Sequence, residues 1–139
     1  MSSNGEVVKG LYDAFSRGDV AAVLGAFDGQ IHWMEAEGFL YADRNPYTGP
    51  QAVAEGVFQR IVTDVDGFAV APQHFIEGAD AVVVEGRYRG TMKATGVPVD
   101  AQFAHIWRLR DGKVVRFQQY TDTGQWLEAA GVQRKLSLT

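Results

Sequence analysis

At 139 residues, 46% of them hydrophobic and 22% charged, the chain has the length and composition of one globular domain with its own core. Its net charge of −4 and scattered basic residues argue against a nucleic-acid partner, because a phosphate backbone is bound by a basic patch. Cysteine is absent, which excludes disulfides and thiolate chemistry; with no apolar run near the roughly 18 residues of a membrane span and no recognisable signal peptide, we expect a cytoplasmic protein without a membrane partner.

The first third of the chain predicts two helices and a strand. Apolar residues recur along 6–16 at the spacing of an amphipathic helix, and Gly18 follows as a left-handed cap. Asp19 is placed to cap a short second helix over 20–27. Alternating residues then predict a strand over 31–35.

The remainder predicts one more helix, four long strands and a short final helix. The third helix begins at Pro50, in the first turn, where a missing N–H costs nothing. The strands are expected over residues 68–78, 80–93, 97–110 and 113–122, and the last helix over 123–131. Asp111-Gly112 is typical of a tight hairpin. We therefore expect one α+β domain over 1–139, with helices on one face of a curved antiparallel sheet, a core at about 6–131 and loose ends at 1–5 and 133–139.

Period-2 alternation puts three polar side chains on otherwise apolar strand faces, namely Glu35, His105 and Gln119. A carboxyl group in an apolar pocket has a raised pKa, which suits a glutamate to accept a proton near neutral pH. A histidine beside it can orient it, donate a hydrogen bond or carry the proton, or can be a structural residue whose hydrogen bonds are satisfied. The two residues therefore either perform chemistry or form a buried pair that shapes the pocket.

The aromatic loop after the first strand has two interpretations as well. Tyr41 and Tyr47 either line the mouth of a ligand pocket or anchor the loop to the core. Neither His32 nor His74 has a second ligand at a metal-binding spacing, so we expect no metal. With no cysteine and no G-x-S-x-G motif, nucleophilic acyl transfer is not indicated either.

Four stretches resemble the nuclear transport factor 2-like superfamily, and within it the SnoaL-like, ketosteroid isomerase-related branch. They are LYDAFSRGDVAAVLGAF, IHWMEAEG, YTGPQAVAEGVF and FAHIWRLRDGKVVRFQQYTDTGQWL, and the resemblance spans about residues 6–131. It implies a cone in which a curved, largely antiparallel mixed sheet wraps three N-terminal helices and leaves a deep pocket. Such proteins include isomerases, polyketide cyclases, epoxide hydrolases, dehydratases and domains without known activity, so the fold alone leaves the reaction open.

The resemblance assigns roles to individual positions. Glu35 corresponds to the carboxylate that abstracts a proton in ketosteroid isomerases, and His105 to the protonated aspartic acid of their oxyanion hole. Their oxyanion tyrosine falls at Leu11, one residue before Tyr12, and this departure weighs against steroid isomerisation. Asp122 corresponds to a catalytic acid of SnoaL-like cyclases, although strand parity puts it on the outer face.

The resemblance thus implies an isomerase, lyase or cyclase that uses neither cofactor nor metal and moves a proton in a small apolar or ring-containing molecule. Its catalytic residues would be Glu35 as base, with His105 and Asp122 as partners. The expected substrate-binding wall consists of Tyr12, Trp33, Tyr41, Tyr47, Tyr88, Phe103, Trp107, Phe117, Gln119 and Tyr120. The alternatives are a ligand-binding module without catalysis and an interaction domain whose pocket is vestigial.

Many members of the superfamily pair through the outer face of the sheet, so the resemblance also implies a homodimer. The outer face expected here is a mixed polar surface with a few apolar positions. It comprises Glu85, Arg87, Arg89, Gln102, Ile106, Arg108, Arg116 and Gln118.

Overall fold

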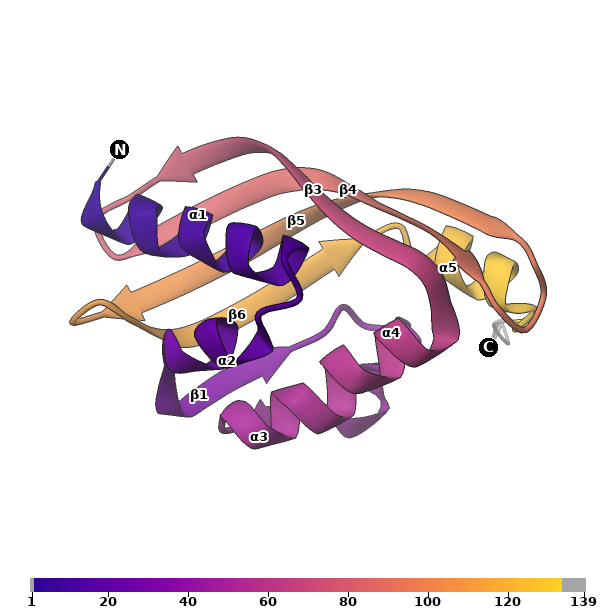
Figure 1. Cartoon of the computed structure of the whole chain (residues 1–139), viewed down its shortest axis with the longest axis horizontal. Helices are drawn as coiled ribbons and strands as arrows, with labels where there is room; N and C mark the ends of the chain where they lie inside the picture. The colour runs from indigo at the N-terminus through magenta and orange to yellow at the C-terminus, as the bar shows by residue number, and fades with distance from the viewer. Residues whose placement is uncertain (1, 134–139) are drawn as a thin grey trace, which may run out of the picture.

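A computed structural model describes residues 2–133, which form a curved sheet with helices packed against one side of it (Figure 1). In chain order the elements are α1 (Ser3–Ser16), α2 (Val20–Gly25), β1 (Phe27–Met34), η1 (Ala42–Arg44), β2 (Tyr47–Thr48), α3 (Pro50–Val53), η2 (Ala54–Phe58), α4 (Gln59–Asp64), β3 (Val65–Glu77), β4 (Ala81–Met92), β5 (Pro98–Arg110), β6 (Lys113–Thr121) and α5 (Thr123–Ala130). This is the α+β architecture expected from the sequence. Most of the C-terminal tail expected to be loose lies outside the described residues.

The strands form one mixed sheet in the order β2-β1-β6-β5-β4-β3. Strands β3 to β6 follow one another antiparallel, whereas β1 lies parallel to β6. Met34, the last residue of β1, pairs with Gln118, so Glu35 emerges from β1 beside Gln119. Within residues 2–133, no helix has both the length and the apolar character needed to cross a membrane.

Local sequence chemistry accounts for the tight connections. Asp111 and Gly112, between β5 and β6, have φ angles of 52° and 75°. Positive φ at both central positions is the conformation of a two-residue hairpin with a type I′ turn, so this prediction is confirmed. Gly18, at 71°, follows α1 as the expected left-handed residue. The Asp19 carboxylate accepts a hydrogen bond from the Ala22 N–H and caps α2, as predicted.

Three predicted boundaries near the N-terminus were wrong. Strand β1 runs over Phe27–Met34 instead of 31–35, so Glu35 lies just beyond its end. Helix α2 ends at Gly25 instead of continuing to 27, because Phe27 opens β1 and pairs with β6. Helix α1 begins at Ser3, inside the segment expected to be loose, because the Ser2 hydroxyl accepts a hydrogen bond from the Gly5 N–H and caps it.

The third predicted helix forms as one continuous run, α3–η2–α4, from Pro50 to Asp64. Its middle, η2, is a π-helical turn, which holds one more residue per turn than an α-helix. The adjacent residues Val57 and Phe58 of this turn are both buried in the core. This helix lies on the same side of the sheet as α1, with α1 packed along β3 and β4 and α3 packed beside β1 (Figure 1).

Gly86 allows the backbone of β3 and the Phe103 ring to approach β4 closely. A side-chain carbon at this position would lie 2.3 Å from the Ala71 carbonyl oxygen and 2.6 Å from the Phe103 ring. Phe103, across the strand pair from Gly86, uses that space to stack on His105, with ring centroids 3.9 Å apart and planes 15° from parallel. The glycine therefore leaves room for the ring that stacks on His105, which lies two residues beyond Phe103 on β5.

We expect Gly86→Ala to lower the free energy of unfolding by about 1–3 kcal/mol, because the added methyl group overpacks against a backbone carbonyl and a buried ring. Urea denaturation measures the change. Gly10→Ala is the matched control, since a side-chain carbon at this exposed helical position meets no atom within 4 Å, and we expect it to stabilise the protein by about 0.5–1 kcal/mol. Equal effects of the two substitutions would contradict the role of Gly86.

Candidate functional site

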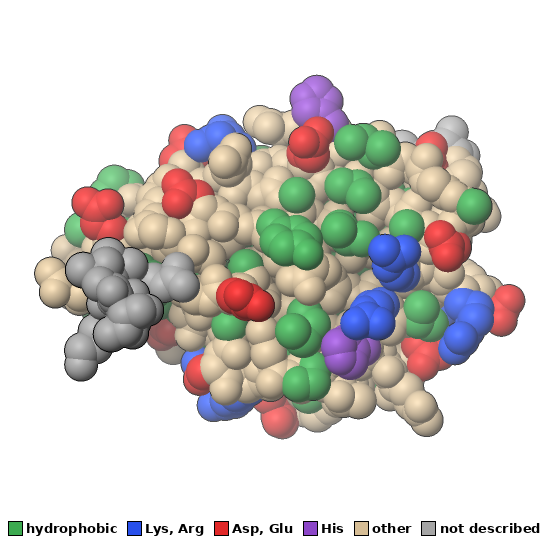
Figure 2. Space-filling model, turned by 180° about the vertical axis from the view of Figure 1, so that it is seen from behind, with side chains coloured by type: hydrophobic (Ala, Val, Ile, Leu, Met, Phe, Trp, Pro, Cys, Tyr) green, Lys and Arg blue, Asp and Glu red, His purple; other side chains and the backbone are tan. Residues whose placement is uncertain are grey.

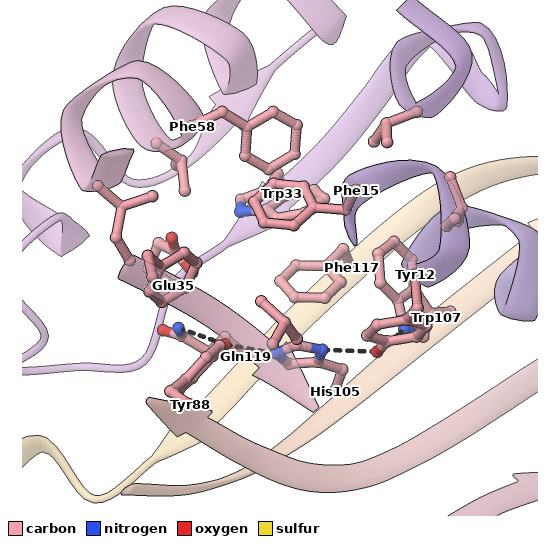
Figure 3. Close-up of a pocket in the computed structure, with 16 residues that line it drawn as sticks. Tyr12, Phe15, Trp33, Glu35, Phe58, Tyr88, His105, Trp107, Phe117 and Gln119 are labelled. Carbon is pink, nitrogen blue, oxygen red and sulfur yellow. Dashed lines mark hydrogen bonds between the residues drawn. The ribbon is translucent and has the colours of Figure 1, made fainter. Parts of the chain in front are cut away.

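A narrow cavity lies between the inner face of the sheet and the helices α1, α2 and η2–α4 (Figure 3). The volume open to the centre of a water molecule is about 70 Å³, and one water needs about 10–15 Å³ on this measure, so the cavity holds several waters or a small ligand. The wall is apolar and aromatic apart from a few polar groups. Its half-buried members are Phe15, Phe68 and Val70, so the cavity comes nearest the surface between α1 and β3.

Glu35 enters the cavity just past the end of β1, with its backbone held on both sides. The Asn45 side chain pairs with it twice: the Glu35 N–H donates to Asn45 Oδ1 at 3.0 Å, and Asn45 Nδ2 donates to the Glu35 carbonyl at 2.8 Å. The next N–H, of Ala36, donates to Gln119 Oε1 at 3.1 Å. These bonds set the direction in which the Glu35 side chain leaves the backbone.

The Glu35 carboxyl group is buried without a positive partner. Only 2% of the residue is exposed, and none of the residues that line the cavity is a lysine or an arginine. Desolvation raises the pKa of Glu35 to about 8. The Trp33 indole N–H offsets this in part, but it does not reach hydrogen-bond geometry, since Trp33 Nε1 has no hydrogen-bond partner among the described residues. The cavity therefore holds a carboxyl group that exchanges its proton near neutral pH.

His105 has both ring nitrogens engaged. Nδ1 lies 2.6 Å from the Tyr12 hydroxyl and Nε2 lies 2.5 Å from the Tyr88 hydroxyl. Burial lowers the pKa of His105 from 6.5 to about 3, so the imidazole is neutral at neutral pH. A histidine that uses both nitrogens in this way has no free N–H for a ligand, so the expectation that His105 itself donates into the pocket is not supported by the geometry.

Six of the ten side chains expected to bind a substrate line the cavity. These are Tyr12, Trp33, Tyr88, Trp107, Phe117 and Gln119. Although the resemblance put the oxyanion tyrosine at Leu11, it is the Tyr12 hydroxyl that reaches His105, while Leu11 contributes an apolar part of the wall. Strand parity predicted the places of Glu35, His105 and Gln119, and all three are buried in the wall.

The other four side chains lie outside the cavity wall. Tyr41 and Tyr47 anchor the loop, because the Tyr41 hydroxyl donates to Asp64 Oδ2 at 2.7 Å and the Tyr47 hydroxyl donates to the Tyr41 carbonyl. Phe103 lies behind His105 as its stacking partner. Tyr120 is 54% exposed on the outer face of β6, on the opposite side from its buried neighbour Gln119.

Asp122 is likewise outside the cavity. Its residue is exposed, and its carboxylate accepts a hydrogen bond from the Gln125 N–H at 3.2 Å, which makes it the N-cap of α5. The strand ends at Thr121, so the alternation that governs side-chain direction ends there too. Capping accounts for an aspartate at this position, and the structure gives Asp122 no part in the wall.

Several wall residues were expected to be core or were not singled out. They are Phe15, Val23, Val57, Phe58, Ile61, Phe68 and Val70. Their apolar periodicity is the same whether a side chain packs against protein or faces a cavity, so the pattern could not separate the two. The Asn45 clamp was also missed, since Asn-Pro is typical of an ordinary turn. Within residues 2–133, no three carboxylate or histidine side chains come together as they would around a metal ion.

Comparison with known proteins identifies the class. The sheet and helices are those of a nuclear transport factor 2-like protein of Burkholderia thailandensis E264, with a TM-score of 0.88 and 32% identity over 93% of this chain and 98% of that one. TerC, which was co-crystallised with polyporic acid, has a TM-score of 0.82 and 27% identity over 94% of this chain and 99% of TerC. A protein described as a SnoaL-like polyketide cyclase, from Jannaschia sp. CCS1, shares the fold at 17% identity and a TM-score of 0.78, over 95% and 94% of the two chains.

The fold is thus nuclear transport factor 2-like, as the sequence resemblance implied. The model of the SnoaL-like domain matches residues 8–117, and the chain belongs to that family. No curated protein matches the sequence.

The buried carboxyl group predicts a pH-dependent stability. Because the pKa of Glu35 is raised to about 8 in the folded state, the unfolded chain loses this proton at lower pH than the folded protein. The Glu35 contribution to the free energy of unfolding should therefore fall as the pH rises from about 4.5 to about 8, by up to about 1.4 kcal/mol per pH unit, with the slope fading as the pH passes 8. His105 acts in the opposite direction and at lower pH, since its pKa is lowered from 6.5 to about 3.

Urea denaturation at a series of pH values measures this slope. Glu35→Gln should abolish it, and Glu37→Gln, an exposed glutamate two residues along the chain, should leave it unchanged. A wild-type protein whose stability is flat between pH 7 and 8 would contradict the raised pKa of Glu35.

Proposed function

We propose that this SnoaL-like protein is a cofactor-independent enzyme in which the Glu35 carboxylate removes a proton from carbon next to a carbonyl group. The observation that carries the proposal is the placement of this carboxyl group in an apolar cavity without a charged partner. A base works best when its pKa lies near the operating pH, and burial raises the pKa of Glu35 to about 8. The reaction would be of the isomerase, lyase or cyclase type.

The substrate in this proposal is small, apolar and ring-containing. The wall offers flat aromatic surfaces, with Trp33 and Phe117 stacked at 3.7 Å between ring centroids and Trp107 edge-on to Trp33. The co-crystallisation of TerC with polyporic acid supports a small organic ligand for this fold at 27% identity. The cavity, at about 70 Å³, is small beside ligand pockets, which usually measure about 300–1,000 Å³. A substrate larger than a single ring would therefore need the half-buried side chains of Phe15 and Phe68 to move.

The second candidate is a ligand-binding protein without catalysis. It is favoured by His105, whose neutral ring already bonds both tyrosines and so cannot serve as a second acid. In this alternative Glu35 binds a polar group of the ligand in its protonated form. The two candidates differ in whether a bound molecule exchanges hydrogen with solvent.

We also propose that two copies pair through the outer face of the sheet. Apolar side chains gather in the middle of the face seen in Figure 2, with charged residues around them. Ile106 is half-buried on this side of β5 and lies between Val83 and Gln118, and Tyr120 is exposed on the neighbouring strand. Apolar residues within a charged rim are the composition of a modest symmetric interface.

To test the catalytic proposal, small cyclic ketones are first screened for binding by thermal shift, since a ligand of the native state raises the melting temperature. Each binder is then incubated in deuterium oxide, and exchange at the carbon next to the carbonyl is followed by NMR. Wild-type protein should accelerate the exchange, with a rate that rises with pH through about 8 as Glu35 loses its proton. Glu35→Gln should slow it by about 10²–10⁴-fold.

Glu37→Gln is the control and should exchange at the wild-type rate, because Glu37 is exposed outside the cavity. Undiminished exchange in folded Glu35→Gln would remove Glu35 as the base. Binding without exchange in the wild type would favour the ligand-binding candidate instead.

The pairing proposal predicts a dimer in analytical ultracentrifugation that Ile106→Glu converts to a monomer, because the new carboxylates would be desolvated in the interface. Val62→Glu, at a 54% exposed position on α4, is the control and should remain dimeric. A monomeric wild-type protein, or a dimer that tolerates Ile106→Glu, contradicts this interface.

A further inference from the structure

A chain of hydrogen bonds runs along one wall of the cavity, from β5 to α1, back to β5, and on to β4 and β6 (Figure 3). Trp107 Nε1 donates to the Tyr12 hydroxyl at 2.8 Å, and Tyr12 in turn bonds His105 Nδ1. On the other side of the ring, His105 Nε2 bonds the Tyr88 hydroxyl, which accepts from Gln119 Nε2 at 3.0 Å. Every one of these side chains lines the cavity.

Both ends of this chain are fixed donors. The indole nitrogen of Trp107 can only donate. The amide of Gln119 cannot be turned round, because its Oε1 accepts the Ala36 N–H and its NH₂ must then face Tyr88. Each of the two tyrosine oxygens therefore accepts one hydrogen bond from outside the central Tyr12–His105–Tyr88 unit.

The Tyr12–His105–Tyr88 unit has one more polar hydrogen than its internal hydrogen bonds use. A neutral imidazole carries one hydrogen and each phenol carries one, which makes three, while only two contacts join the hydroxyls to the ring. If the imidazole hydrogen is on Nε2, Tyr12 donates to Nδ1 and the hydrogen of Tyr88 is free. If it is on Nδ1, Tyr88 donates to Nε2 and the hydrogen of Tyr12 is free.

Ionisation does not remove the extra hydrogen. Burial lowers the pKa of His105 to about 3 and raises those of Tyr12 and Tyr88 well above 10, so all three are neutral at neutral pH. Glu35 is the one carboxyl group in the cavity wall, and its pKa of about 8 keeps it mostly protonated at neutral pH as well.

We propose that this surplus phenolic hydrogen binds an oxygen acceptor of the ligand, a ketone or the enolate formed from it, and that the tautomer of His105 selects whether Tyr12 or Tyr88 donates it. His105 is then a positioning residue that never touches the ligand. The inference deepens the proposed function, since it names the ligand group that the cavity recognises, but it concerns binding and does not require turnover.

The first test compares cyclohexanone with methylenecyclohexane, which has the same shape but carries CH₂ in place of the oxygen. Binding is followed by the fluorescence of the cavity tryptophans. We expect wild-type protein to prefer the ketone by about tenfold, the contribution of one buried hydrogen bond. The double variant Tyr12→Phe/Tyr88→Phe should lose this preference, and Tyr120→Phe, which alters an exposed tyrosine on the outer face, should keep it. Equal affinity of the wild type for both molecules overturns the proposal.

The second test reads the tautomer directly from ¹⁵N NMR of histidine-labelled protein with cyclohexanone bound, the His105 resonances being assigned by their loss in His105→Asn. In Tyr12→Phe the ketone must take its hydrogen from Tyr88, so His105 should carry its own hydrogen on Nε2. In Tyr88→Phe the hydrogen should be on Nδ1. The reverse pattern, in which the remaining tyrosine donates to His105, overturns the proposal.

Tyr12→Phe removes the hydrogen-bond partner of Trp107 and could prevent folding. The ketone preference of the wild-type protein is measured without any variant, so the first test can be decided even in that case. The outcome is also separable from that of the proposed reaction. A ketone preference without hydrogen exchange would refute Glu35 as a catalytic base and leave this inference standing.

Discussion

The constraint on which the rest of the site depends is the burial of the Glu35 carboxyl group among apolar side chains. Such a group destabilises the fold when ionised, because no lysine or arginine lines the cavity to replace the water it has lost. The protein holds it in place through the backbone: Asn45 clamps one side and Gln119 the other. Rigid backbone with an unpaired side chain is an arrangement suited to chemistry, since the carboxyl group is oriented and yet left free to exchange its proton.

The polar side chains of the wall around His105 differ from Glu35, because nearly all of their polar atoms have hydrogen-bond partners. Tyr12, His105 and Tyr88 bond to one another, with Trp107 and Gln119 closing the ends. Gln119 links the two walls, because one end of its amide holds the residue after Glu35 and the other holds Tyr88. A change on either side is therefore transmitted through one side chain, and a ligand between the walls would contact both an exchangeable acid and the one phenolic hydrogen that the hydrogen-bonded row leaves unpaired.

The sequence predicted what is governed by local rules. Alternation along the strands put Glu35, His105 and Gln119 on the inner face, and the hairpin at Asp111-Gly112 formed because both residues adopt positive φ. Relations between distant segments could not be predicted in the same way. Parity does not say that a tyrosine on α1 reaches a histidine 93 positions later. Parity put Asp122 on the outer face, and the residue is exposed, but it did not predict that the strand ends at Thr121 and that Asp122 caps α5.

The central claim, that Glu35 is a desolvated acid of raised pKa, is tested most directly by infrared spectroscopy. The difference spectrum between wild type and Glu35→Gln isolates the carbonyl stretch of this one carboxyl group. At neutral pH the band of a protonated acid should be present, and it should convert to carboxylate bands as the pH passes about 8. Carboxylate bands at neutral pH, with protonation only near the 4.5 of an ordinary glutamate, would contradict the account.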